Sequence, residues 1–254
     1  MVVSVTEMLE QEGIHMSNDR VRIGIIGGGG IAQAHAAQYL KLPDVHVTAV
    51  ADIVPGRAQA FIERMGLVGT RAFTDYHDLL ALDIDGVDIC TFNRAHCQPA
   101  IDALVAHKHT MVVKPMSVTL EEAVAMVHTS RKTGAMLMIN FISRWEPHTL
   151  AARRVVASGE LGQIYYVESG GGRRYGIPGG TFISKATAGG GAVLDIGCYA
   201  IDTVMYALGN PRPLTVSATT SAHLGSSPDY SPPNRTNTGR LTLAPSTWKT
   251  LGSL

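Results

Sequence analysis

From Val21 to about Phe141 the sequence alternates between short apolar runs and longer segments in which apolar residues recur with helical spacing. The short runs are rich in β-branched residues and end at turn residues, which predicts strands. Because these strands are almost continuously apolar, they are typical of a parallel sheet covered by helices on both faces. The expected strands are Val21–Ile26, Val45–Ala51, Val87–Cys90, Thr110–Val113 and Ala135–Ile139, and the expected helices are Ile31–Leu40, Arg57–Met65, Asp78–Leu82, Pro99–Ala106 and Leu120–Thr129.

After Phe141 this rhythm changes. Glycine-rich and polar segments separate the periodic ones, and Gly209-Asn210-Pro211 is a typical helix end. Beyond Ser221 roughly half of the residues are Ser, Thr, Pro or Gly, a composition typical of loops or disorder. We expect a helix over Pro147–Ser158, a turn at Gly159–Gly162, strands at Ile164–Glu168 and Leu214–Thr219, a long loop over Ser169–Gly191 and a helix from about Val193 to Leu208.

The composition excludes several classes of partner. The 254 residues include 21 basic and 21 acidic side chains and no polybasic run, so neither nucleic acid nor an anionic membrane is expected. Apolar residues make up 45% and charged residues 17%, which indicates an ordered globular protein. Cys90, Cys97 and Cys198 have no metal-like or disulfide-like spacing, so we expect no metal and reduced thiols. The acidic N-terminal sequence is unlike a signal peptide. No apolar run approaches the ~18 residues that a membrane-spanning helix needs. A cytoplasmic protein is expected.

The strongest local motif follows the first expected strand. Gly27, Gly29 and Ala32 fill the G-x-G-x-x-A form of the dinucleotide fingerprint, and Gly30 and Ile31 open the next helix. In this motif Gly27 permits a tight turn, Gly29 lets the backbone approach a pyrophosphate, and Ala32 lets helix and strand pack closely. The N–H groups at the helix start then bind the anion at the positive end of the helix dipole.

An acidic residue stands where this fingerprint requires one. Asp52 closes the second expected strand about 25 residues after Gly27, where an acid can hydrogen-bond the adenosine ribose hydroxyls. Its carboxylate would repel a 2′-phosphate, which favours NAD over NADP. Arg57 is close enough in sequence to weaken that preference, so NADP stays possible. The alternative is a glycine turn with no ligand and a solvated Asp52.

Three further segments fall where a ligand crevice forms in open parallel sheets. Thr91, Asn93 and His96 follow the strand that ends at Cys90, although Asn93 and His96 could serve only to shape the turn. Lys114 and Pro115 follow the strand that begins at Thr110. Asp195 and Tyr199 are four positions apart on an expected helix, so both project from one face. Each of these three residues also has a structural alternative: a surface lysine for Lys114, a helix cap for Asp195 and a packing side chain for Tyr199.

Arg144 and Trp145 are further candidates. They could line a sugar site, or they could pair with other groups within the domain.

The ordered set of motifs resembles the Gfo/Idh/MocA oxidoreductase family, named for glucose–fructose oxidoreductase and inositol dehydrogenase. The resemblance extends from about Val21 to Thr219 and rests on GIIGGGGIA, AVAD, DGVDICTFN, HKHTMVVKP, RWEP, SGELG and GGGAVLDIGCYAID. It implies an α/β protein with an N-terminal Rossmann domain, a doubly wound parallel sheet. An α+β domain with a mostly antiparallel sheet would follow.

The resemblance also implies roles for individual residues. The lysine of the family's Glu-Lys-Pro motif approaches the nicotinamide, usually ahead of a cis proline, and Lys114 and Pro115 occupy those positions. In the Asp-x-Gly-x-His motif Asp195 matches the aspartate, while Tyr199 stands in place of the histidine. Lys114 is then expected to act as base or proton relay, flanked by Asp195 and Tyr199. Tyr199 would need a cationic neighbour such as Lys114 to titrate near pH 7.

The sequence departs from the family pattern at three places. Val113 replaces the glutamate of Glu-Lys-Pro, and Phe92 replaces the proline of Thr-Pro-Asn. The C-terminal domain is expected to be incomplete, because family members continue further. We therefore divide the chain into an N-terminal extension (1–19), a Rossmann domain (20–141), a partial substrate or oligomerisation domain (142–220) and a low-order tail (221–254).

The function implied by the resemblance is hydride transfer between NAD(P) and a sugar, polyol or related secondary alcohol. A homo-oligomer is expected if the C-terminal sheet is sufficiently complete. Two alternatives stay open: a glycosidase-like enzyme that oxidises its sugar transiently with bound NAD, and a dinucleotide-binding protein without catalysis.

Overall fold

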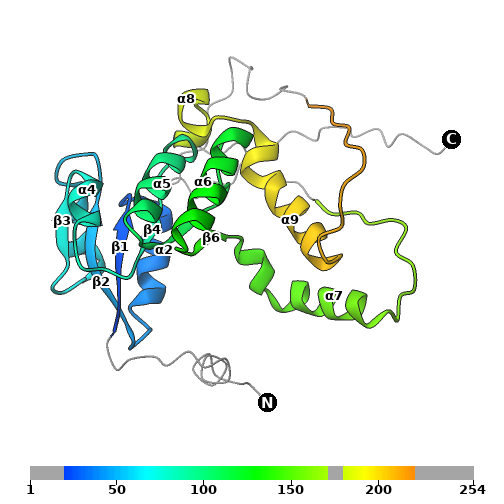
Figure 1. Cartoon of the computed structure of the whole chain (residues 1–254), viewed down its shortest axis with the longest axis horizontal. Helices are drawn as coiled ribbons and strands as arrows, with labels where there is room; N and C mark the ends of the chain where they lie inside the picture. Colours follow the sequence, from blue (N-terminus) through cyan, green and yellow to red (C-terminus); the bar gives the residue numbers. More distant parts are fainter. Residues whose placement is uncertain (1–19, 171–179, 221–254) are drawn as a thin grey trace, which may run out of the picture.

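A computed structural model describes residues 20–170 and 180–220 of the chain (Figure 1). Within them, six strands form one sheet in the order β3-β2-β1-β4-β5-β6, and every neighbouring pair is parallel. The chain reverses its direction of winding between β1 and β4, as in doubly wound nucleotide-binding sheets. The strands are β1 (Val21–Ile26), β2 (Val45–Ala51), β3 (Arg71–Phe73), β4 (Gly86–Ile89), β5 (His109–Val113) and β6 (Leu137–Asn140).

Helices cover both faces of this sheet and create two separate apolar clusters. Ile25 packs with Phe61 in one cluster, while its neighbour Ile26 packs with Met126 in the other. This division arises because successive side chains of a strand point to opposite faces. The first face carries α2 (Gly30–Tyr39) and α3 (Arg57–Met65), and the second carries α4 (Tyr76–Leu80), α5 (Cys97–Val105) and α6 (Leu120–Thr133).

The prediction of a parallel, doubly wound α/β domain is confirmed. Strands β1 and β2 and helix α3 have the expected bounds. Strand β3 was not expected, because a three-residue strand with two exposed side chains has no readable apolar pattern. It extends the sheet beyond β2 through pairing at Ala49–Ala51.

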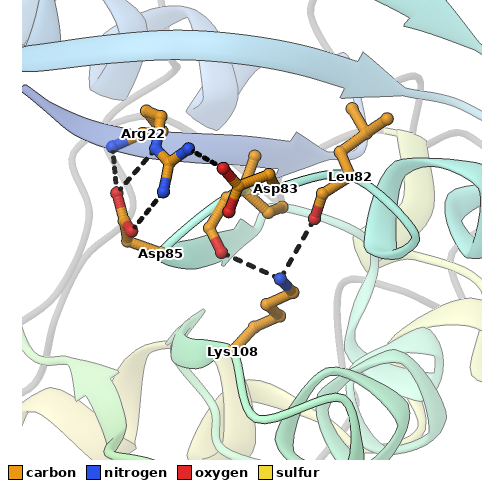
Figure 2. Close-up of polar contacts among 6 residues, drawn as sticks. Arg22, Leu82, Asp83, Asp85 and Lys108 are labelled. Carbon is orange, nitrogen blue, oxygen red and sulfur yellow. Dashed lines mark hydrogen bonds and ion pairs between the residues drawn. The ribbon is translucent and has the colours of Figure 1, made fainter.

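Ionic and hydrogen-bond contacts hold the amino ends of the strands (Figure 2). The guanidinium of Arg22 on β1 pairs with Asp83 and, at 3.0 Å, with Asp85 in the loop before β4. This guanidinium lowers the pKa of the Asp85 carboxyl. Lys108 Nζ donates to the backbone oxygens on either side of Asp83, at 3.0 Å each. These contacts lie at the sheet edge opposite the carboxyl ends of the strands, where ligands bind in such folds.

Helices dominate the second half of the described chain. Helix α7 has the expected bounds and packs beside α9 (Figure 1). The Arg144 guanidinium binds both carboxylate oxygens of Asp202, which is 9% exposed, so Arg144 pairs within the domain and does not line an open site. The elements are η2 (Ile142–Trp145), α7 (Pro147–Ser158), η3 (Gly180–Phe182), α8 (Lys185–Ala188), η4 (Val193–Gly197) and α9 (Cys198–Ala207).

Several expectations for this half are corrected. Ile164–Glu168 and Leu214–Thr219 are not strands, because neither has a neighbouring strand with which to exchange hydrogen bonds among the described residues. The expected loop over Ser169–Gly191 contains η3 and α8. The expected extension (1–19), low-order tail (221–254) and the centre of that loop (171–179) lie outside the described residues. In the described ranges, no helix is both long and apolar enough to cross a membrane.

Candidate active site

The glycine turn between β1 and α2 provides an open helix start. Gly27 has φ +97°, and a Cβ there would lie 2.8 Å from the backbone oxygen of Cys90, so only glycine fits without strain. A Cβ on Gly29 or Gly30 would meet nothing within 4 Å. The first N–H groups of α2 have no partner within the helix. Ile31, in the same turn, is 45% exposed.

Asp52 lies against this turn at the end of β2. Its Oδ2 accepts a hydrogen bond from Gly28 N–H at 2.8 Å, and its Oδ1 accepts one from Val54 N–H at 2.9 Å. Arg57 Nη1 is 3.6 Å from the same Oδ1, and the Arg57 side chain is half exposed. A carboxylate has about four lone-pair positions, so Asp52 keeps acceptor capacity for a ligand.

Lys114 and Asp195 come together from distant parts of the chain. Lys114 follows β5 and precedes a cis peptide bond to Pro115. Its Nζ donates to Asp195 Oδ1 at 2.9 Å and also to the Asp195 backbone oxygen. Both side chains are 15% exposed, so solvent screens the pair only weakly.

Asp195 lies in η4, a π-helical turn directly before α9. Such turns occur frequently at functional sites. Four positions further, the ring of Tyr199 has its centroid 4.8 Å from Lys114 Nζ, and Phe141 meets this ring edge-on at 6.1 Å. The three residues expected to be catalytic therefore form one cluster.

The structure places the amine of Lys114 against the ring of Tyr199. Lys114 Nζ lies over the face of the ring, a cation–π arrangement. Burial raises the pKa of the Tyr199 hydroxyl, and the negative charge of Asp195 raises it further. Lys114 thus contacts the face of the ring, and the pKa of the hydroxyl is raised, which is the direction away from neutral pH.

The residues after β4 are engaged mainly with protein groups. Thr91 Oγ1 donates to the Ala95 backbone oxygen at 2.8 Å. Asn93 is buried, and its Nδ2 donates to the backbone oxygen of Ala188 at 3.0 Å, which connects this loop to α8. We expected these residues to contact a cofactor; in this structure their described contacts shape the loop and hold α8 beside it.

His96 connects the two loops that precede α5 and α6. It is fully buried, with Nδ1 2.7 Å from the Pro115 backbone oxygen and Nε2 3.2 Å from the Thr91 backbone oxygen. Burial lowers the pKa of His96. The polar contacts of the ring are to these two protein carbonyls, as in the alternative that His96 shapes the turn. The sequence left this alternative open beside cofactor contact.

The fold and the glycine turn define a Rossmann-type dinucleotide-binding α/β protein. Residues 21–141 match the model of the Gfo/Idh/MocA oxidoreductase family with an NAD-binding Rossmann fold, and residues 149–237 match the family's C-terminal domain. The chain therefore belongs to the Gfo/Idh/MocA oxidoreductase family, which confirms the resemblance seen in its motifs.

Relatives with assigned activities include two sugar or polyol dehydrogenases. D-glucoside 3-dehydrogenase of Escherichia coli K12 is 37% identical over 213 residues, which are 83% of this chain and 60% of the relative. Inositol 2-dehydrogenase of Salmonella typhimurium LT2 is 34% identical over 158 residues, 61% of this chain and 46% of the relative. The chain thus spans about half to three fifths of the length of these relatives.

Solved structures show the same architecture. GenD2 from gentamicin A biosynthesis, in complex with NAD, superimposes with a TM-score of 0.67 at 25% identity and covers 78% of this chain and 56% of that one. Levoglucosan dehydrogenase in complex with NADH gives a TM-score of 0.67 at 28% identity, over 75% of this chain and 54% of that one.

Proposed function

We propose that this chain binds NAD at its glycine turn and transfers hydride between the nicotinamide and a CH–OH carbon of a sugar, polyol or related secondary alcohol. The observation that carries this proposal is the Lys114–Asp195 pair at the carboxyl edge of the sheet. Strand β5, which Lys114 follows, adjoins β4, and Cys90, directly after β4, lies against Gly27. Family membership and the named activities of the relatives support the same reaction class.

The residues of the glycine turn fit a dinucleotide. The open space before Gly29 and Gly30 admits a diphosphate close to the N–H groups of α2. Asp52 is positioned to accept hydrogen bonds from ribose hydroxyls, and its negative charge disfavours a 2′-phosphate. NAD, when bound, supplies the hydride acceptor for alcohol oxidation. We propose Ile31 and Arg57 as further contacts at the rim of this site.

Lys114 is positioned to handle the hydroxyl proton. An ammonium has three N–H positions, and the described contacts to Asp195 use two of them. The third remains for a substrate hydroxyl. Asp195 orients the amine and balances its charge, the role that a glutamate at position 113 would otherwise share. Tyr199 forms one wall of the site and, as a neutral phenol, can donate a hydrogen bond to the substrate.

The remaining parts of the proposal concern organisation. We assign residues 20–141 to the dinucleotide-binding domain and residues 142–220 to the substrate side. An antiparallel sheet in the C-terminal domain and an oligomer built on it rest on family membership alone. Cys90, Cys97 and Cys198 are all free thiols, which supports a reducing compartment such as the cytoplasm.

The test is the absorbance band of NADH, followed with NAD and a panel of sugars and polyols. We expect reduction of NAD by at least one of these alcohols, and no turnover by Lys114→Met. The matched control is Lys132→Met, which removes an exposed lysine of α6 and keeps wild-type activity. Release of free sugar from a glycoside without net NADH would favour the glycosidase-like alternative. A folded chain that binds NAD but oxidises none of the panel would favour binding without catalysis.

A further inference from the structure

A second group of polar side chains lies inside the Rossmann domain, between α2 and β4. His35 Nδ1 is 2.7 Å from Asp88 Oδ2 and 3.6 Å from Cys90 Sγ, and one ligand-type atom from each residue lies within 4.8 Å of the others. Asp88 and Cys90 are two positions apart, so they point to the same face of the sheet. Sequence spacing did not predict this group, because His35 is 53 positions before Asp88.

The Asp88 carboxylate is the unusual member of this group. It is 2% exposed, and its Oδ1 is buried with no hydrogen-bond partner among the described residues. Its other oxygen, Oδ2, receives the contact from His35 and a hydrogen bond from the Tyr39 hydroxyl at 3.0 Å. Buried carboxylates are normally paired with a cation or bound to a metal, since an isolated buried charge is very costly. The described contacts give Asp88 no arginine or lysine partner.

His35 is oriented in the way that metal-bound histidines are. Its Nδ1 faces both Asp88 and Cys90, while its Nε2 lies 3.0 Å from the side-chain amide of Asn140 on β6. A half-turn of this amide presents its oxygen to Nε2–H. A hydrogen bond of that kind holds the ring of a ligating histidine and leaves the opposite nitrogen for the metal.

We propose that His35, Asp88 and Cys90 form a binding site for a divalent transition metal of the zinc class. Imidazole, carboxylate and thiolate together are the donors that Zn²⁺ prefers, whereas Mg²⁺ and Ca²⁺ take oxygen ligands. Tetrahedral Zn–N and Zn–S bonds place the two ligand atoms about 3.6 Å apart. The separation of His35 Nδ1 and Cys90 Sγ is 3.6 Å. Binding releases the thiol proton to solvent, shifts the imidazole proton from Nδ1 to Nε2, and widens the short contact between His35 Nδ1 and Asp88 Oδ2.

The site has an approach and a fourth position. A cavity of about 200 Å³, lined by Tyr39, Asp88, Met111 and Met138 among others, opens beside the carboxylate. The Tyr39 hydroxyl, or a water at its place, completes four ligands. Because the backbone oxygen of Cys90 faces Gly27, a bound metal would connect α2 to β4 directly beneath the glycine turn. This inference is independent of the proposed hydride transfer.

The experiment is a titration of the metal-free, reduced full chain with Co²⁺, which reports ligation by its spectrum. We expect saturation at equimolar Co²⁺, a thiolate-to-cobalt charge-transfer band, and the visible bands of tetrahedral Co²⁺. Zn²⁺ should displace the cobalt and remove these bands. Cys90→Ser should lose the charge-transfer band, whereas Cys97→Ser, which alters a partly buried thiol outside the group, should keep it.

Circular dichroism verifies that each variant is folded. Should Cys90→Ser fail to fold, His35→Gln takes its place and must weaken Co²⁺ binding at least tenfold. Two results overturn the proposal: folded wild-type chain that gives no thiolate–cobalt band, or a band that persists in folded Cys90→Ser. Binding that a folded His35→Gln retains at full strength overturns it as well. In that case, a water that donates a hydrogen bond to Asp88 Oδ1 would explain why this buried oxygen has no protein partner among the described residues.

Discussion

Lys114 Nζ lies 2.9 Å from Asp195 Oδ1, although the two residues are 81 positions apart in the sequence. One follows a strand of the Rossmann sheet and the other lies in a π-helical turn of the second half. Each side chain is mostly buried and orients the other. The pair therefore links the cofactor-binding half of the chain to the half proposed to hold the substrate.

This relationship predicts the effect of Asp195→Asn. The amide preserves the size of the side chain but removes the charge that orients and balances Lys114. Since positioned acid–base groups contribute about 10²- to 10⁴-fold, we expect kcat to fall by about 10²-fold or more. The Kd for NAD, measured by fluorescence titration, should change less than about twofold because the glycine turn is untouched. An equal loss in kcat and NAD affinity would contradict the assigned role.

Substitutions at two glycines of the turn should have different effects, one on the stability of the chain and the other on its affinity for NAD. Gly27→Ala introduces a Cβ at φ +97°, 2.8 Å from the Cys90 backbone oxygen, so we expect a loss of more than about 1–2 kcal/mol in the free energy of unfolding. Gly29→Ala meets open space, so its stability should stay within about 0.5 kcal/mol of wild type. Its NAD affinity should nevertheless fall, because the added Cβ stands where the diphosphate approaches. Urea unfolding and NAD titration of both variants give the comparison.

Asp52 should control the choice between NAD and NADP. Asp52→Ser removes a charged acceptor whose hydrogen bonds are worth about 1.5–3 kcal/mol, so we expect the Kd for NAD to rise about tenfold or more. The Kd for NADP should fall relative to that for NAD, because the repulsion of a 2′-phosphate is gone. Arg57→Ala is the partner variant and should weaken NADP more than NAD. Wild-type chain that binds NADP more tightly than NAD would contradict the ribose assignment.

His96 predicts a pH dependence of stability with a defined sign. Burial lowers the pKa of His96 in the folded chain, so the unfolded chain binds this proton more readily. The stability contributed by neutral His96 is complete above its unfolded pKa of about 6.5 and is lost as the pH falls below that value. His96→Leu should flatten this part of the profile and cost about 1–3 kcal/mol, since it removes the one N–H that neutral His96 donates to a buried carbonyl.

The conservative variant His96→Gln tests whether His96 acts through Pro115. Its amide can still donate to the Pro115 backbone oxygen, so it should recover part of the kcat that His96→Leu loses. Both variants are compared by denaturation between pH 5 and pH 8 and by steady-state kinetics. A wild-type profile no steeper than that of His96→Leu below pH 6.5 would count against this account.

The Arg144–Asp202 pair predicts a purely structural effect. Asp202 is buried, and the partly exposed Arg144 guanidinium binds both of its carboxylate oxygens. Arg144→Met leaves this carboxylate without its cation, and we expect a loss of about 1–3 kcal/mol. Arg154→Met, on the exposed side of α7, should change stability by less than about 0.5 kcal/mol. A drop in activity of Arg144→Met without loss of stability would place Arg144 at the substrate instead.

The sequence predicted the elements whose periodicity is strong. β1, β2, α3 and α7 have the expected bounds because their apolar spacing and end residues are clear. Ile164–Glu168 was expected to be a strand from its β-branched and aromatic residues, but a strand also needs a neighbour, which no local pattern supplies. Helix α8 was not predicted, because its four residues lie within a glycine-rich stretch that is typical of a loop.

The candidate site was predictable in membership but not in geometry. Motif order pointed to Lys114, Asp195 and Tyr199, and the structure brings them together. That Lys114 lies over the Tyr199 ring and not at its hydroxyl depends on helix placement, which the sequence does not reveal. The group of His35, Asp88 and Cys90 was also not predicted from the sequence, because these residues come together only when α2 packs against β4 and the residue that follows it.

The most direct test of the account is isothermal titration calorimetry of the full chain with NAD and with NADP. We expect equimolar binding of NAD, a higher Kd for NADP, and a marked loss of NAD affinity in folded Gly29→Ala. Folded chain that releases or absorbs no heat with either dinucleotide at several temperatures would contradict the central claim.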